Sequence, residues 1–215
     1  MYTLLLAVIY LAFISLGLPD SLLGAAWPTI RVDFNVPLSY MGLVSMIIAG
    51  GTIISGLMSE RLTKKFGTRA VVAVSVALTA IALFGFSTVG QFWQMCLWGI
   101  PYGFGAGAID AALNNYVALY YNSRQMSWLH CFWGVGTIIS PYIMSYALTH
   151  STWSNGYRNV SYIQFGILAV ILIAMPLWKI NKDPAVTEED KPLLGLRGAL
   201  KIKGVPTLLI GFYAY

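Results

Sequence analysis

Two acidic side chains occupy places where acids are uncommon. Of the eight Asp and Glu residues, only Asp20 and Asp110 fall clearly inside long apolar stretches. Asp110 and Asn114 are four residues apart, so on a helix they share one face. That face carries a carboxyl group and an amide that both donates and accepts hydrogen bonds. Because low-dielectric surroundings favour the protonated form of a carboxyl group, Asp110 is a candidate for binding and releasing a proton.

Asp20 follows Pro19, which removes a backbone donor and favours a kink in a helix. We expect the freed carbonyl and the Asp20 carboxyl group to line a polar cavity together. Two simpler interpretations stay open. Asp20 would then be a helix-end acid held by water at the outer membrane interface, and Asp110 would form a structural hydrogen bond to a neighbouring helix.

His130 opens another apolar stretch and is a candidate for relaying a proton or for hydrogen bonding to a substrate. A packing role is the alternative. Trp98, Trp128 and Trp133 would form a stacking surface for a sugar ring, or serve as aromatic residues at the membrane interface.

The cysteines and glycines predict no further chemistry. Cys96 and Cys131 lie in apolar runs without the spacing of a metal site. We therefore expect no metal and no cofactor. Gly99, Gly103 and Gly107 repeat every four residues, as close packing between membrane helices requires.

Composition indicates the environment that must position these residues. The 215-residue chain is 58% hydrophobic and 10% charged, whereas soluble domains carry about 25% charged residues. The net charge of +5 comes from short clusters between apolar runs, which argues against nucleic acid as a partner. The sequence predicts an all-α membrane protein in the lipid bilayer.

Six segments reach the length of about 20 apolar residues that a membrane-spanning helix needs. We expect the first to stop at Pro28. The predicted spans are Thr3–Trp27, Ser39–Met58, Ala70–Val89, Phe92–Tyr120, Met126–Leu148 and Ser161–Trp178.

The basic residues predict the orientation of these spans. Eleven of the thirteen Lys and Arg residues fall in the connections on one side, and only Arg31 and Arg158 fall on the other. Since basic loops stay in the cytoplasm, we expect a multi-pass protein of the cell membrane with a cytoplasmic N-terminus.

The chain changes character after the sixth span. Residues 1–178 form the predicted six-helix bundle, and the charged residues 179–203 form a predicted cytoplasmic linker. A seventh apolar segment, 204–215, is too short to cross a bilayer. We expect the chain to be a piece of a longer protein. The bundle itself divides into two three-helix units with an acid late in the first helix of each, which suggests inverted repeats.

A motif between the second and third spans carries a resemblance to a known family. It resembles the signature G-x-x-x-D-[RK]-x-G-[RK]-[RK] of the major facilitator superfamily, at that family's position. The residues concerned are Gly56, Glu60, Arg61, Lys64, Lys65, Gly67 and Arg69, with Glu60 in place of Asp and Thr63 in place of the inner glycine. Glu60 lies at a helix C-terminus, where a negative charge is disfavoured, so we expect Arg61, Arg69 or another helix to neutralise it. The resemblance implies a gating loop, although a simple topology anchor is the alternative.

Within that superfamily the chain looks similar to the fucose-permease-like branch of sugar–proton symporters, through Asp20 and Asp110 in spans one and four. The resemblance implies the N-terminal half of a facilitator fold. It also implies protons and a sugar-like small molecule as partners, with a missing C-terminal half or a second copy. Three alternatives differ in class: a proton-driven drug or metabolite antiporter, a non-transporting fragment or assembly subunit, and an intramembrane enzyme. No catalytic constellation supports the enzyme.

Overall fold

The computed structural model describes residues 2–179, 198 and 200–208, and within these ranges it contains helices and no strand. The chain divides into two compact units, Met1–Trp178 and Lys179–Tyr215. The first unit consists of α1 (Tyr2–Asp20), α2 (Leu22–Asp33), α3 (Tyr40–Phe66), α4 (Thr68–Phe86), α5 (Phe92–Tyr120), α6 (Ser123–His150), α7 (Trp153–Ile173) and the 3-10 helix η1 (Met175–Lys179).

Helices α1 and α2 together form the first predicted span, which is longer than expected. The helical path is interrupted at Ser21 and then continues through Pro28 to Asp33. The prediction that Pro28 ends the helix is therefore wrong. Buried Trp27 and Ile30 flank Pro28, and Trp27 also donates a 3.0 Å hydrogen bond to the Leu38 carbonyl. This packing holds the helix together despite the missing backbone donor.

Other helix ends also extend past the apolar core. Helix α3 continues through polar last turns to Phe66, and Gly67, at φ 79°, ends it. Helix α7 begins at Trp153, eight residues before the predicted Ser161, so Arg158 lies inside the helix and not in a loop. The predicted span Phe92–Tyr120 agrees with α5, which starts at a capping box formed by Gln91 and Gln94.

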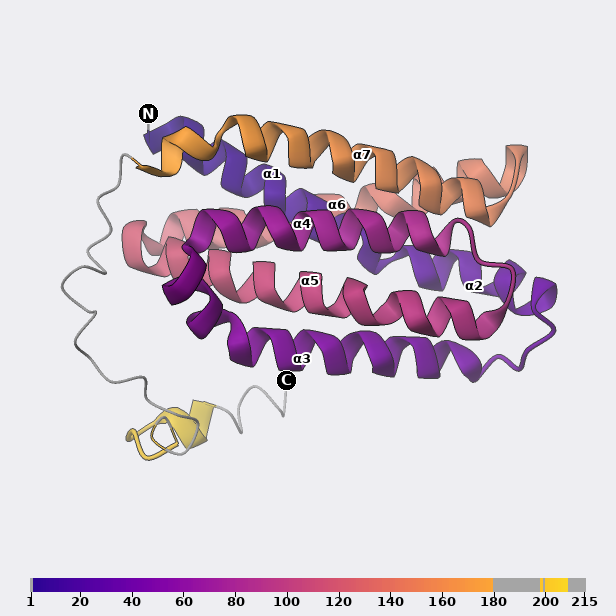
Figure 1. The fold of residues 1–215 in the computed structure, drawn as a ribbon, viewed down its shortest axis with the longest axis horizontal. Coiled ribbons are helices and arrows are strands. Elements are labelled where there is room, and N and C mark those ends of the chain that lie inside the picture. The colour runs from indigo at the N-terminus through magenta and orange to yellow at the C-terminus, as the bar shows by residue number, and fades with distance from the viewer. Residues whose placement is uncertain (1, 180–197, 199, 209–215) are drawn as a thin grey trace. The chain divides into compact units, whose positions relative to one another are not determined.

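Five helical segments are long and apolar enough to cross a membrane: Thr3–Asp33, Tyr40–Phe66, Thr68–Phe86, Ser123–His150 and Trp153–Ile173. Helix α5 has 29 residues but contains Asp110, Asn114 and Asn115, and it does not meet the same criterion within the described chain. Helix α5 packs along both α3 and α4 (Figure 1). Asp110 and Asn115 are exposed, so they lie outside these packed faces.

The helices of the first unit pack in a simple order. Helix α4 lies between α5 and α7, and α3 covers the far side of α5 (Figure 1). Helix α1 packs against α6, which also contacts α7. Helices α3 and α6 are the least covered of these segments. In their apolar stretches 17% and 22% of the residues are buried, against 61% in α4. Wide apolar faces of α3 and α6 therefore remain open in this unit.

The second unit is described only in part. Its described residues include Gly204, at φ 101°, followed by a helical turn at 205–208. Most of the predicted linker 179–203 and of the predicted seventh span 204–215 lies outside the described residues.

Candidate functional site

The Asp20 carboxylate joins three helices. It lies at the end of α1 and accepts hydrogen bonds on both oxygens. The Tyr102 hydroxyl group of α5 donates to Oδ1 over 3.1 Å, and the Trp133 indole of α6 donates to Oδ2 over 2.9 Å. Tyr102 is buried, whereas Asp20 and Trp133 are exposed. The carboxylate therefore has fixed donors on one side and an open side for a ligand or a proton.

Asp20 ends α1 but does not end the apolar helical segment. Helix α2 continues the span beyond it, so Asp20 lies near the middle of the segment Thr3–Asp33. Its partners are protein side chains from α5 and α6. Acids that remain in the interior of membrane segments in this way usually have a functional role.

Asp110 and Asn114 share one face of α5. The Asn114 amide donates to the Asp110 carboxylate over 2.9 Å and to the Asp110 carbonyl over 3.0 Å. Asp110 is exposed. It lies eight residues beyond Tyr102, which corresponds to roughly 12 Å along a helix. The two acids therefore occupy two levels of the bundle.

His130 lies on α6, the helix that also carries Trp133. The imidazole is exposed and meets the Phe13 ring edge-on, with 6.0 Å between ring centroids. His130 and Trp133 are three residues apart on α6, so they share a helix face. We call Asp20, Asp110, Asn114 and His130 together the acid face.

Two glycines bring the backbone of α6 against α1. A Cβ atom on Gly17 would overlap the Trp133 carbonyl oxygen, and one on Gly136 would overlap the Ile14 carbonyl oxygen. Because neither glycine has a side chain, the two backbones touch one turn before Asp20. This close approach places the Trp133 indole within reach of the carboxylate.

The carbonyl that Pro19 frees does not line a cavity with Asp20, contrary to expectation. In a helix the N–H of residue 19 would bond to the carbonyl of Ser15. Ser15 is buried, and its carbonyl accepts a 2.6 Å hydrogen bond from the Gln164 side chain of α7.

The residues predicted as a gating loop are mostly helical. Gly56, Glu60, Arg61, Lys64 and Lys65 lie in α3, Gly67 separates the helices, and Arg69 lies in the first turn of α4. The partner of Glu60 is Lys64, at 3.2 Å, and not Arg61 or Arg69. The four-residue spacing keeps this pair on one face of the extended helix.

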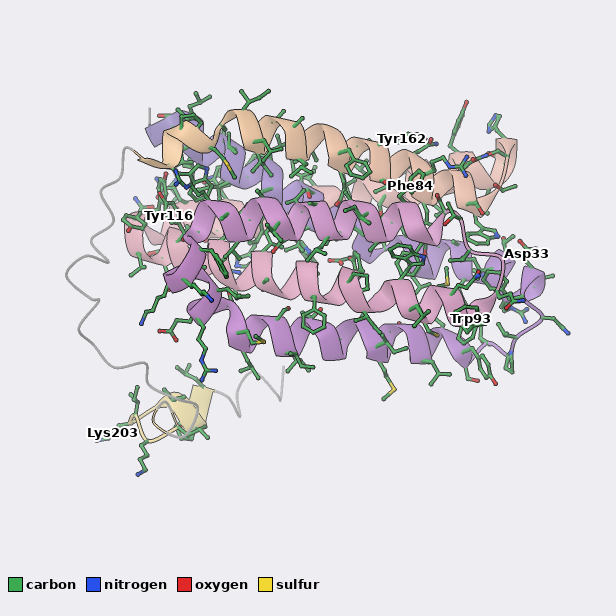
Figure 2. The ribbon with its side chains drawn as sticks, viewed as in Figure 1. Asp33, Phe84, Trp93, Tyr116, Tyr162 and Lys203 are labelled. Carbon is green, nitrogen blue, oxygen red and sulfur yellow. The ribbon has the colours of Figure 1, made fainter. Side chains whose placement is uncertain are left out.

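The three tryptophans do not form one surface. Trp133 bonds to Asp20, Trp128 packs near Phe132, and Trp98 fills the place that a Cβ atom on Gly85 would take. A cavity of about 370 Å³ lies at the start of α5, which carries the exposed Trp93 (Figure 2). Its lining residues are Thr88, Val89, Trp93, Gln94, Leu97, Trp98 and Pro101, so it is separate from the acid face. Among the described residues, no three His, Cys, Asp or Glu side chains could hold a metal ion.

Tyr102 and Gln164 are site residues that sequence reasoning missed. Tyr102 is one of thirteen tyrosines, and nothing in its local sequence distinguishes it. Gln164 had a detectable signal, because a glutamine in the interior of an apolar span needs a hydrogen-bond partner.

Comparisons with known proteins agree with this architecture. The chain is 25% identical over 172 residues to Bypass of stop codon protein 6 of Saccharomyces cerevisiae, covering 79% of this chain and 34% of that protein. It is 21% identical over 186 residues to the cis,cis-muconate transport protein of Acinetobacter baylyi, covering 85% and 43%. Similarity to synaptic vesicle glycoprotein 2C of Rattus norvegicus is 22% over 173 residues, covering 79% and 24%.

The chain spans less than half the length of each of these relatives. Residues 9–215 match the family model described as Major Facilitator Superfamily. This match covers both acids and the charged end of α3. The chain is therefore a multi-pass membrane protein that belongs to the Major Facilitator Superfamily.

Proposed function

We propose that this chain is one half of a secondary active transporter that couples protons to the movement of a small polar solute. One observation carries the proposal. An exposed carboxylate, Asp20, lies within a membrane segment and is held by donors from two other helices. Asp110, a second exposed acid on one of these helices, would bind and release the coupled proton.

The composition of the acid face favours a neutral solute rich in hydroxyl groups, such as a sugar. Carboxylates accept hydrogen bonds from hydroxyl groups, and the Asn114 amide both donates and accepts them. The exposed Trp133 ring offers an apolar surface beside Asp20. Helices α1 and α5, which carry the two acids, contain no Lys or Arg, so neither helix supplies a permanent cation that would attract an anionic solute.

The uncovered faces of α3 and α6 support a second part of the proposal. We propose that a C-terminal half or a second copy covers these faces, and that rocking of the two halves exposes the acid face to each side in turn. In this arrangement the N-terminus is cytoplasmic, and the Glu60–Lys64 end of α3 lies at the inner membrane surface.

The test is uptake of radiolabelled sugars into vesicles that contain the protein expressed from its complete gene. Asp110→Asn should abolish proton-driven accumulation. Exchange of solute down its gradient should remain, because asparagine keeps the hydrogen bonds but cannot bind and release a proton. Asn115→Ala, one residue away on the same helix, is the matched control and should accumulate normally. Accumulation by Asp110→Asn at the wild-type level would overturn the proton-site assignment. Proton-driven efflux of apolar compounds, with no uptake, would favour an antiporter.

A further inference from the structure

The backbone carbonyl that Pro19 frees accepts a hydrogen bond from another helix. Pro19 leaves the Ser15 carbonyl without its helical donor, and Ser15 is 1% exposed. A buried carbonyl in a membrane segment cannot form a hydrogen bond to water instead. The Gln164 side chain of α7, itself 0% exposed, donates to this oxygen over 2.6 Å.

The orientation of the Gln164 amide follows from its neighbours. The Ser15 carbonyl can only accept, so the NH₂ group must face it. The amide oxygen then faces Thr79 of α4, whose hydroxyl group lies 2.8 Å away and donates. Each end of the amide has a partner of the correct kind, and the side chain is held on both sides.

The same group also reaches the helix that carries Asp110. A Cβ atom on Gly105 of α5 would lie 2.8 Å from the Thr79 methyl group, so α5 rests directly on Thr79. Gln164 and Thr79 therefore contact both acid-bearing helices. Asp20 follows Pro19 directly, so the local backbone geometry at Pro19 sets where its carboxylate meets Trp133.

We propose that Gln164 is a positioning residue for Asp20. It caps the carbonyl that Pro19 frees. In this way it fixes the local backbone geometry that places the Asp20 carboxylate against the Trp133 indole. This inference rests on the proposed function only for its effect on transport, because the placement of Asp20 is measured separately below.

The experiment uses the protein from its complete gene, labelled with 5-fluorotryptophan, and follows the ¹⁹F resonance of Trp133. Trp133→Phe identifies the resonance, and Asp20→Ala gives its position without the hydrogen bond. Gln164→Leu should move the resonance towards the Asp20→Ala position and raise the KM for the transported solute about tenfold. Pro19→Ala restores the backbone donor, so adding it to Gln164→Leu should return the resonance towards that of Pro19→Ala alone.

Ser161→Ala is the matched control. Ser161 lies one turn before Gln164, is equally buried, and donates to the Ala80 carbonyl of α4 over 2.9 Å. It should lower thermal stability and leave the Trp133 resonance in place. If Gln164→Leu does not fold, Thr79→Val removes the donor to the Gln164 oxygen and should cause a smaller shift in the same direction.

The outcomes separate this inference from the proposed function. An unmoved Trp133 resonance in folded Gln164→Leu or Thr79→Val overturns the positioning role, whatever transport does. So does a shift of equal size in Ser161→Ala. A shift in Gln164→Leu with unchanged KM supports the positioning role and shows instead that Asp20 does not bind the solute.

Discussion

The contacts of α3 with α5 and of α1 with α6 use the same packing device and different polar groups. In the first, Gly103 lies against the Ile48 carbonyl and Gly51 lies against the backbone of Gly103. Hydroxyl groups then bridge the two helices: Ser59 donates to the Ala108 carbonyl over 3.2 Å, and Thr52 to the Gly103 carbonyl over 3.3 Å. Each of these hydroxyl groups donates to a backbone carbonyl.

In the second contact, Gly17 and Gly136 face each other's helix in the same reciprocal way. Its nearby polar bond ends on a titratable group, because the Trp133 indole donates to the Asp20 carboxylate. Spans four and two in the first contact correspond to spans one and five in the second, as the predicted inverted repeat requires. Close packing therefore holds two helices together in the first contact and also holds a carboxylate in place in the second.

The largest effect should come from enlarging Gly103. In Gly103→Val the side chain would meet the Ile48 backbone, which cannot rotate away, so we expect a loss of about 3 kcal/mol or more of unfolding free energy. Thermal unfolding in detergent measures this loss. The control is Gly50→Val, in open space on the partner helix α3, which should unfold near the wild-type temperature. Equal melting temperatures for the two variants would contradict the close contact.

A smaller change in the other contact should affect the site more than the stability. In Gly136→Ala the methyl group presses on the Ile14 carbonyl and moves α6 away from α1. The Trp133–Asp20 bond then lengthens, and we expect KM to rise about tenfold. Gly134→Ala, two residues away with no neighbour within 4 Å, is the control for uptake kinetics. An unchanged KM in Gly136→Ala would mean that helix spacing does not govern the site.

Removing only the indole donor should have a weaker effect. Trp133→Phe keeps an aromatic ring and loses the N–H, while Tyr102 still donates to Asp20. The loss of one typical hydrogen bond, about 1 kcal/mol, should change KM about fivefold, measured by solute uptake at several concentrations. If Trp133→Phe changed only the melting temperature, its bond to Asp20 would be structural.

The smallest effect should come from a hydroxyl group between α3 and α5. Ser59→Ala removes the bond to the Ala108 carbonyl and should cost about 0.6 kcal/mol of stability, the average for such bonds in membranes. Chemical unfolding measures the stability, and uptake should remain unchanged. A raised KM in Ser59→Ala would remove the distinction between the two contacts.

The helical architecture could be predicted from the sequence because it depends on local properties. Long apolar stretches must form helices in lipid, and the span Phe92–Tyr120 was predicted with correct ends. Errors arose where helices outlast their apolar stretch. The last turns of α3 stay helical through the Glu60–Lys64 pair and end only at Gly67.

The candidate site was predictable only in its acids. Asp20 and Asp110 stand out because charge is rare in spans, and the Asp110–Asn114 pair follows from helical spacing. The partners of Asp20 depend on packing between distant segments, since Tyr102 and Trp133 lie 82 and 113 residues away. No local pattern encodes such contacts.

The bond between Gln164 and Ser15 has a consequence for biosynthesis. The two residues are 149 positions apart in the chain. At about 5–20 residues per second, a ribosome takes roughly 7–30 s to travel from one to the other. During that interval α1 has left the ribosome with one carbonyl that no other part of the nascent chain can cap. Helix α1 therefore gains this hydrogen bond only after α7 has been made, and ribosome pausing before Gln164 would prolong the time for which the Ser15 carbonyl lacks its partner.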